Sequence, residues 1–214
     1  QEGVLRRTEL NMLLAQINPH FLYNTLDSII WMAEGRKYEE VVLMTASLAR
    51  LLRQSISNED EVVPLAREVE YAKGYLTIQK MRYKDKLEFE IDVEPSILNI
   101  PLIKLVLQPI IENAIYHGLK YKESKGLLQV KGFMKDGNAV LQVIDNGVGM
   151  DEETLSHIYD KHKVNYHSNG VGVYNVQKRL KLYYGENYGI TYESEKGVGT
   201  TATIIIPGIQ EESI

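Results

Sequence analysis

The sequence predicts an α+β protein: an N-terminal helical hairpin followed by an α/β sandwich with helices on one face of a mixed sheet. Three observations support this fold class. Apolar residues recur at helical spacing before residue 57, strand-like alternation begins near residue 87, and helical and strand patterns then alternate to the end. Because 214 residues exceed the usual size of one compact domain, we expect a helical region at 1–60 and a second domain at 61–214.

Two amphipathic helices are predicted between residues 8 and 57. Gly35 and its polar neighbours supply the turn between them. Two such helices cannot bury both of their apolar stripes alone, so a second hairpin or the rest of the chain must cover them, which predicts a homodimer. The acidic run at 57–61 is the expected boundary.

The remaining chain is expected to alternate between helices and strands. Pro64 suits the first turn of a helix that ends near residue 82, and residues 87–92 alternate as in a half-buried strand. Pro101 is expected to open a helix that ends at Leu119. The later elements are strands at 128–134 and 140–144 with a turn at 136–138, helices near 151–160 and 173–184, and strands near 189–194 and 200–206.

The composition is that of a soluble globular protein and narrows the classes of function. Hydrophobic residues make up 44% of the chain and charged residues 25%. The net charge of −5 argues against nonspecific binding to nucleic acid, and we expect no such partner. The chain contains no cysteine, which excludes disulfides, thiolate nucleophiles and zinc–thiolate sites. No apolar run approaches the roughly 20 residues of a membrane helix.

The segment 145–150, DNGVGM, directly follows an apolar predicted strand. Its two glycines allow a tight turn and a close approach of the backbone to a ligand. A carboxylate at the strand end, Asp145, can accept a hydrogen bond from the exocyclic amine that distinguishes adenine from guanine. The alternative is a simple turn in which Asp145 caps the next helix.

Two polar residues interrupt the apolar helix predicted before this strand. In the segment 108–118, QPIIENAIYHG, Glu112 and Asn113 both need partners. The carbonyl oxygen of Asn113 is a neutral ligand of the kind that Mg²⁺ accepts beside phosphates and water. Glu112 is a candidate general base, and a hydrogen-bonding or structural role explains it equally well.

A second glycine turn, 169–172, precedes the predicted helix at 173–184. Backbone amides of such a turn at a helix start form an anion site that suits the phosphates of ATP. The polar stretch 161–168 before it suits a lid over a nucleotide. A plain turn and a solvated loop explain the same residues.

The segment 16–26, QINPHFLYNTL, places a histidine directly after a proline. A neutral imidazole is a nucleophile that needs no strong base. Pro19 disfavours helix at Asn18, so His20 is expected just after a kink or at a helix start that Asn18 caps. The alternative is a surface histidine near a helix break.

The order of these motifs, with Gly199-Thr200 leading into the last strand, resembles the GHKL (Bergerat-type) ATPase superfamily of gyrase, Hsp90, histidine kinases and MutL. The resemblance covers residues 65–207. It implies that Asn113 coordinates Mg²⁺, that Asp145 binds the adenine amino group of ATP, and that Thr200 supports Asp145 directly or through water. It also implies that nucleotide-contacting residues include Gly147, Gly149, Asn169, Gly170 and Gly172.

The residues around His20, together with 75–83 and 176–185, resemble sensor histidine kinases of the LytS/YesM type. This implies a two-component kinase core that autophosphorylates His20 from Mg-ATP and passes the phosphoryl group to a response-regulator aspartate. It also implies a homodimer and the cytoplasmic portion of a bacterial sensor whose membrane attachment lies outside this chain. Phe21 stands where many histidine kinases carry an acidic residue, so the identity of the general base, Glu112 included, is open.

Two other functions fit the same residues. An ATPase of this superfamily would use Glu112 to activate water and would release phosphate without forming a phosphoprotein. A catalytically silent dimeric scaffold would bind nucleotide, or nothing, without stable labelling.

Overall fold

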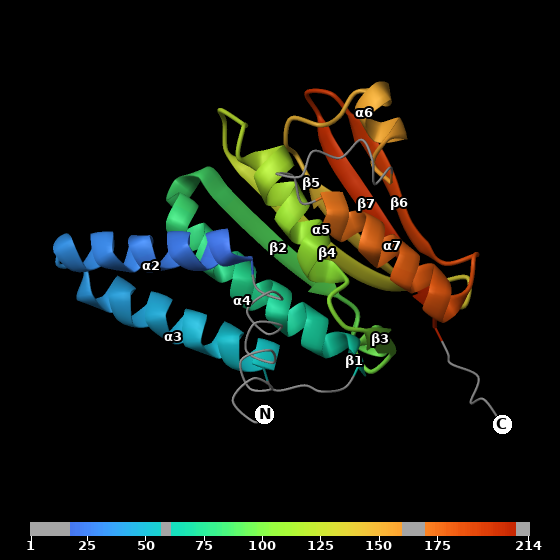
Figure 1. Ribbon diagram of the computed structural model, residues 1–214, viewed down its shortest axis with the longest axis horizontal. Coiled ribbons are helices and arrows are strands. Elements are labelled where there is room, and N and C mark those ends of the chain that lie inside the picture. Colours follow the sequence, from blue (N-terminus) through green and yellow to red (C-terminus); the bar gives the residue numbers. More distant parts are fainter. Residues whose placement is uncertain (1–17, 57–60, 160–169, 209–214) are drawn as a thin grey trace, which may run out of the picture. The chain divides into compact units, whose positions relative to one another are not determined.

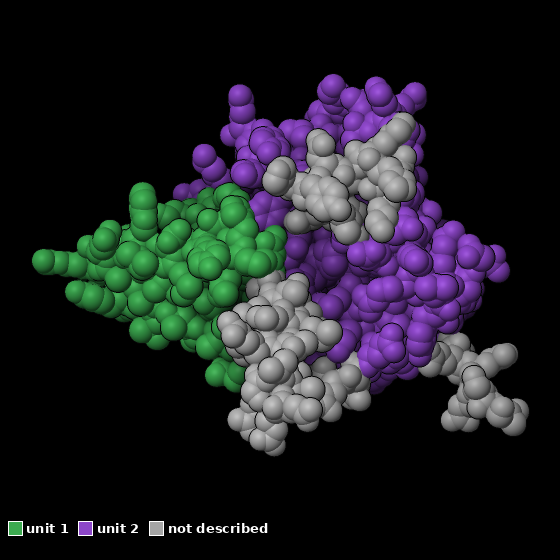
Figure 2. Space-filling view, viewed as in Figure 1, with its two compact units in different colours: residues 1–60, 73–84 green, residues 61–72, 85–214 purple. Residues whose placement is uncertain are grey.

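The computed structural model of the chain describes residues 18–56, 61–159 and 170–208. The chain divides into two compact units, which Figure 2 colours separately. Unit 1 contains residues up to 60 and residues 73–84, and unit 2 contains residues 61–72 and those from 85 onward. Helix α4 (Leu65–Tyr83) therefore belongs to unit 2 in its first part and to unit 1 in the rest.

Unit 1 is built on a helical hairpin, α2 (Pro19–Glu34) and α3 (Tyr38–Ile56) (Figure 1). Helix α2 begins as a capped helix, because the side chain of Asn18 accepts a hydrogen bond from the backbone N–H of His20 at 3.0 Å. Gly35 ends α2 and opens the turn to α3. The predicted hairpin is confirmed over these residues, and its expected first part, 8–17, lies outside the described residues.

A buried aromatic pair anchors α2 to the part of α4 that belongs to unit 1. The ring of Phe21 is 1% exposed and lies 4.7 Å from the ring of Tyr75, centroid to centroid. The hydroxyl of Tyr75 accepts from Gln79, whose oxygen in turn accepts from Arg82, each at 2.8 Å. Since Phe21 faces the core, its neighbour His20 is left on the exposed side of α2.

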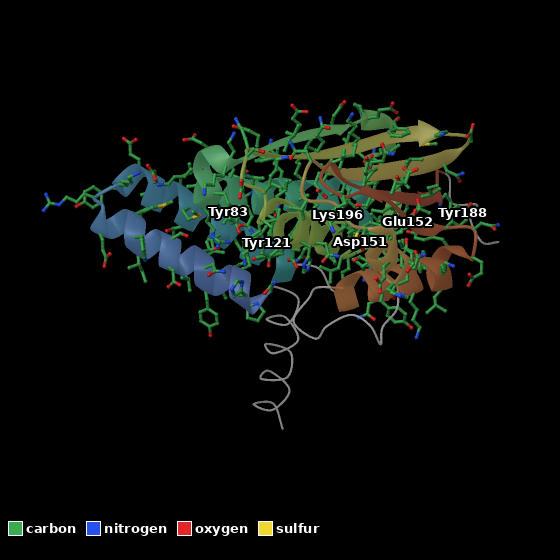
Figure 3. All side chains as sticks on the ribbon, turned by 90° about the horizontal axis from the view of Figure 1, so that it is seen from above. Tyr83, Tyr121, Asp151, Glu152, Tyr188 and Lys196 are labelled. Atoms are coloured by element: carbon green, nitrogen blue, oxygen red, sulfur yellow. The ribbon has the colours of Figure 1, made fainter. Side chains whose placement is uncertain are left out.

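Unit 2 contains a five-stranded mixed sheet in the order β2-β4-β5-β7-β6. Strands β2 and β4 are parallel, and the other pairs are antiparallel. Helices α5 (Leu107–Asn113) and α7 (Gly170–Tyr184) cover one face of the sheet, as Figures 1 and 3 show. The predicted α+β fold class is confirmed. The strands are β2 (Leu87–Val93), β4 (Gly126–Lys135), β5 (Asn138–Asp145), β6 (Gly189–Glu195) and β7 (Gly199–Pro207).

The turn between β4 and β5 lies where it was predicted but has two residues, because Asn138 already belongs to β5. Asp136 and Gly137 both have positive φ, of 51° and 77°, which fits the twist of a two-residue hairpin. Short 3₁₀ turns also occur at Lys84–Lys86 and Pro95–Ile97. Helix α6 (Glu152–Ser156) is shorter than the predicted 151–160 and begins where the side chain of Asp151 accepts from the backbone of Thr154.

The prediction that Pro101 opens a helix is wrong. Residues Pro101–Ile103 form strand β3, which pairs antiparallel with β1 (Val62–Pro64). Leu105 then adopts a positive φ of 61°, so helix α5 starts only at Leu107. Beyond α5 the chain continues as a π-helical segment, Ala114–Leu119, and the amide of Lys120 donates to the carbonyl of Ile115.

Candidate active site

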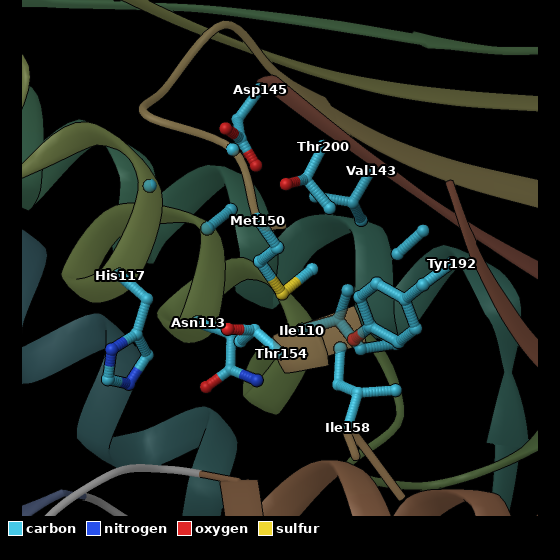
Figure 4. A pocket seen from close by; sticks show the side chains of 14 residues that line it. Ile110, Asn113, His117, Val143, Asp145, Met150, Thr154, Ile158, Tyr192 and Thr200 are labelled. Atoms are coloured by element: carbon cyan, nitrogen blue, oxygen red, sulfur yellow. The ribbon is translucent and has the colours of Figure 1, made fainter. Parts of the chain in front are cut away.

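Unit 2 holds a cavity of about 370 Å³ between α5, α6, the turn after β5, and strands β6 and β7 (Figure 4). Four residues predicted for the site from sequence, Asn113, Asp145, Gly149 and Thr200, line this one cavity. The rest of the wall is largely apolar and includes Ile110, Val143, Met150, Ile158 and Ala202. The cavity is therefore suited to a flat apolar group with a few polar atoms at its edge.

Asp145 is the last residue of β5, and its side chain is only 6% exposed. Its Oδ1 accepts a hydrogen bond from the backbone N–H of Gly147 at 2.8 Å. Burial raises the pKa of Asp145 to about 6, although the backbone N–H groups of Gly147 and Thr200 and the charge of Lys122 oppose this rise. A carboxyl group in apolar surroundings thus offers acceptor oxygen to whatever enters the cavity.

Close packing around Asp145 requires glycine at two positions. A Cβ on Gly118 would lie 2.7 Å from Asp145 Oδ1, and a Cβ on Gly147 would collide with the backbone of Gly118. The amide of Val148 donates to the carbonyl of Gly118 at 3.1 Å, which holds the two segments together. Gly149 lines the cavity, whereas Gly147 supports it by this packing. Sequence analysis missed Gly118, although it closes the motif that carries Asn113.

Asn113 is the last residue of α5, and its Oδ1 is buried without a hydrogen-bond partner among the described residues. The hydroxyl of Tyr192, on the same cavity, is also buried and has no such partner in the described part of the chain. Burial and the neighbouring Tyr159 raise the pKa of Tyr192. The nearby side chain of Asn113 opposes this rise. A buried unpaired oxygen is costly, and a bound cation would satisfy it. The residues therefore fit the Mg²⁺ that the resemblance implies.

Glu112 is buried beside Asn113 but does not line the cavity. Its Oε1 accepts from the side-chain amide of Gln108 at 2.9 Å. Burial raises the pKa of Glu112, and the bond from Gln108 opposes the rise. Its role as a general base stays a prediction.

Thr200 lies opposite Asp145 across the β5–β7 pair. Its hydroxyl shares a hydrogen bond of 2.8 Å with Ser194, and Ser194 also accepts from the amide of Met150. This small network links β6, β7 and the turn that follows Asp145. The supporting role predicted for Thr200 stays a prediction.

The second glycine turn is described only in part. Gly170 is the first residue of α7, and Gly172 lies in the first turn, where a Cβ would be 3.3 Å from the side chain of Pro109. Asn169 and the polar stretch 161–168 lie outside the described residues. The phosphate contacts predicted for these residues stay predictions.

His20 lies in unit 1, as the second residue of α2, and is exposed. The side-chain nitrogen of Asn24, one turn further along, lies 2.9 Å from Nδ1 of His20. The capped helix start and this contact orient the imidazole ring on the outer side of the hairpin. Sequence analysis did not assign a role to Asn24.

Two family comparisons match the chain. Residues 99–210 match the family described as histidine kinase-, DNA gyrase B- and HSP90-like ATPase. The chain belongs to this family, and membership of the family implies ATP binding. Residues 8–87 match the family described as histidine kinase. The predicted resemblance to sensor histidine kinases of the LytS/YesM type is thereby confirmed.

Curated relatives of the chain include a sensor histidine kinase and a sensor protein. The chain is 36% identical to the sensor histidine kinase YesM of Bacillus subtilis over 95% of its own length and 34% of the relative's. It is 33% identical to the sensor protein LytS of Oceanobacillus iheyensis over 86% of its length and 32% of the relative's. The chain thus spans about a third of the length of these curated relatives. Among the described helices, none has both the length and the apolar character needed to cross a membrane.

Solved structures share the fold. The histidine kinase domain of the Erythrobacter litoralis EL346 blue-light activated histidine kinase aligns over 94% of this chain and 93% of its own, with a TM-score of 0.53 and 15% identity. The catalytic domain of the histidine kinase ThkA aligns over 70% of this chain and 99% of its own, with a TM-score of 0.53 and 16% identity. At these identities the likeness concerns the fold alone.

Proposed function

We propose that this chain is the kinase core of a two-component sensor, in which Mg-ATP bound in unit 2 phosphorylates His20 of unit 1. The observation that carries the proposal is the single cavity that brings Asp145, Asn113, Gly149 and Thr200 together. An exposed histidine at the start of a capped helix supplies the acceptor. Residues 1–60 would carry the acceptor and the dimer contacts, and residues 61–214 the catalytic function.

Asp145 would select adenine. Its carboxylate keeps one oxygen on the amide of Gly147, and the group lines the cavity with acceptor capacity to spare. The exocyclic amine of adenine is a donor, whereas guanine presents an oxygen at the same place, so the carboxylate favours ATP over GTP. Apolar residues such as Ile110 and Met150 would pack against the base.

Asn113 would hold the metal through Oδ1, a buried oxygen that has no hydrogen-bond partner among the described residues. Bound there with the phosphates, Mg²⁺ supplies charge neutralisation for the transferred group. The glycine turn at the start of α7, Asn169 to Gly172, would donate backbone amides to the same phosphates. Catalysis by these residues is then a matter of position and charge.

His20 would act as the nucleophile. A neutral ring nitrogen attacks the γ-phosphorus, the new N–P bond forms as the bond to the bridging oxygen breaks, and ADP leaves in line. The ring proton is then lost to solvent or to a base, for which Glu112 is the predicted candidate. The contact from Asn24 would hold the ring in one orientation during the attack.

The partners follow from the same reading. The phosphoryl group of His20 would pass to an aspartate of a response-regulator receiver domain. Exposed apolar side chains on the hairpin support a homodimer, in which a second hairpin covers them: Tyr23, Leu26, Ile30 and Trp31 on α2, and Tyr38, Val42 and Leu43 on α3. The chain would be the cytoplasmic part of a bacterial sensor anchored in the membrane through another region.

Incubation with γ-labelled ATP and Mg²⁺ tests the proposal. The wild type should acquire a label that is labile in acid and stable in alkali, as a phosphoramidate is, and His20→Gln should bind ATP normally yet stay unlabelled. His157→Gln, a change of the same chemistry at a histidine of unit 2, is the matched control and should keep its label. Full labelling of the His20→Gln protein would overturn His20 as the acceptor, and phosphate release without any phosphoprotein would favour the ATPase alternative.

A further inference from the structure

Glu68, on the part of α4 that belongs to unit 2, is a buried carboxylate that accepts hydrogen bonds from three backbone amides. Its Oε1 accepts from the N–H of Leu105 at 2.8 Å. Its Oε2 accepts from the N–H groups of Val106 at 2.9 Å and Leu107 at 3.0 Å. Three consecutive amides therefore converge on one side chain that is only 8% exposed.

These amides belong to the start of helix α5. The first turn of a helix has N–H groups without partners inside the helix, and Val106, at the cap position, supplies no side-chain hydrogen bond of its own. Glu68 therefore caps α5 from another helix, and its charge is favourable at a helix N-terminus. Figure 1 shows that α4 and α5 both begin beside the small β1–β3 sheet.

The loop before α5 is in an unusual conformation that Glu68 helps to hold. Leu105 has a positive φ of 61°. Residues other than glycine adopt this backbone conformation only when their surroundings impose it. The preceding carbonyl, that of Lys104, accepts from Arg179 of α7 at 2.7 Å. The carboxylate of Glu68 and the guanidinium of Arg179 together fix the point at which α5 starts.

Asn113 depends on that starting point. Helix α5 has only seven residues, so its last residue, Asn113, lies less than two turns from Leu107, the last of the amides that Glu68 holds. Buried Leu107, Ile110 and Ile111 fix where the helix packs. Apolar contacts are not directional, whereas three hydrogen bonds to one carboxylate define the orientation of the first turn.

We propose that Glu68 is a positioning residue of the nucleotide site, which sets the orientation of α5 and so directs the oxygen of Asn113 to the metal that accompanies ATP. The inference rests on the proposed function, because it takes Asn113 as the metal ligand. Glu68 itself touches neither nucleotide nor metal. Its loss should therefore weaken the response to Mg²⁺ more than the binding of the adenine, which Asp145 holds from β5.

The test compares Glu68→Gln with the wild type in two titrations of the full chain. Glutamine keeps the size of the side chain but turns an N–H₂ group toward at least one of the three amides, so the cap is broken. In EDTA, ATP should bind to the variant within about threefold of the wild-type affinity. With ATP present, the Mg²⁺ concentration at half-maximal labelling of His20 should rise at least tenfold, as a weaker form of the effect of Asn113→Ala.

A matched control separates positioning from loss of stability. Ile97→Val removes one buried methyl group from unit 2 at a position outside residues 104–107, and its Mg²⁺ titration should superimpose on that of the wild type. If Glu68→Gln does not fold, as judged by circular dichroism, Glu68→Asp carries the test with the same criteria, because it keeps the charge and shortens the reach.

Several outcomes would overturn the proposal. A wild-type Mg²⁺ response in the folded variant, an equal loss of metal-free and metal-dependent binding, or the failure of both variants to fold would each make Glu68 a residue of stability alone. If the wild type itself were not labelled on His20, the proposed function would fail instead, and metal-free and Mg²⁺-supported ATP binding would still decide the role of Glu68.

Discussion

Replacing Asp145 by asparagine is expected to make the ligand-free protein more stable while it weakens ATP binding. The pKa of Asp145 rises from 3.8 to about 6 on burial, so the folded protein holds this proton more tightly than the unfolded chain does. The free energy of unfolding should therefore fall as the pH rises from about 4 to about 6 and then stay level, for a total cost of about 3 kcal/mol. Asparagine removes this cost.

Part of the stability gained by Asp145→Asn is offset by weaker contacts of the new side chain. The amide oxygen of asparagine can still accept from Gly147, but it loses the charge that strengthens this bond and the attraction of Lys122. The net gain at pH 8 should be about 1–2 kcal/mol. The affinity for ATP should fall, because the new N–H₂ group of the asparagine faces the amine of adenine and two donors cannot pair. An unpaired donor costs about 1–3 kcal/mol, which raises Kd by about 5- to 150-fold.

Urea unfolding at pH 5 and pH 8, followed by circular dichroism, measures the change in the free energy of unfolding. Calorimetric titration of ATP in EDTA measures the change in ATP affinity. The matched control is Asp136→Asn, which removes the same charge in the exposed β4–β5 turn, where asparagine suits the positive φ. The stability gain of Asp145→Asn should shrink at pH 5. A variant less stable than the wild type at pH 8 would refute the burial argument, and unchanged ATP affinity would refute the contact with adenine.

Two further predictions concern the metal and the pH. Asn113→Ala should bind ATP in EDTA within about threefold of the wild type but lose the gain that Mg²⁺ gives in binding and in labelling, because it removes the unpaired oxygen. A normal magnesium titration would make Asn113 a structural residue. Adenosine, which has no titrating phosphate, should bind more weakly as the pH falls through about 6, because Asp145 then carries a proton. An affinity independent of pH between 5 and 8, measured by NMR titration, would contradict this.

The sequence predicts most strands of the sheet and four of the residues that line the cavity, Asn113, Asp145, Gly149 and Thr200. The strand at 87–92 is predicted from the alternation of apolar and polar residues, and the turn near 136–138 from its turn-forming residues. Both elements are found in the structure. The motif at 145–150 places Asp145 at a strand end because a buried strand and a glycine turn are local features. Features of this kind can be predicted without knowing what packs against them.

The misses depend on contacts between distant segments. Residues 101–103 are a strand only because β1, some forty residues earlier, pairs with them, and no local pattern marks so short a strand. Glu68 reads as an ordinary solvated residue of an amphipathic helix, and only the fold brings Leu105 to it. Gly118 carried a signal, since a glycine interrupts a helical motif, but the reason for it is the nearby carboxyl of Asp145.

Helix α4 carries one buried stripe through both units, and this constrains its length. Glu68, Ala72, Tyr75 and Gln79 recur every three or four residues and are all at most 8% exposed. Deleting one residue between Glu68 and Tyr75 would rotate everything beyond it by about 100° and move it by about 1.5 Å along the axis. The face that carries Tyr75 and Gln79 would then no longer be in line with the face that carries Glu68 and Ala72. Substitutions at the exposed positions of α4 leave the register of this buried face intact, whereas an insertion or deletion of a single residue does not.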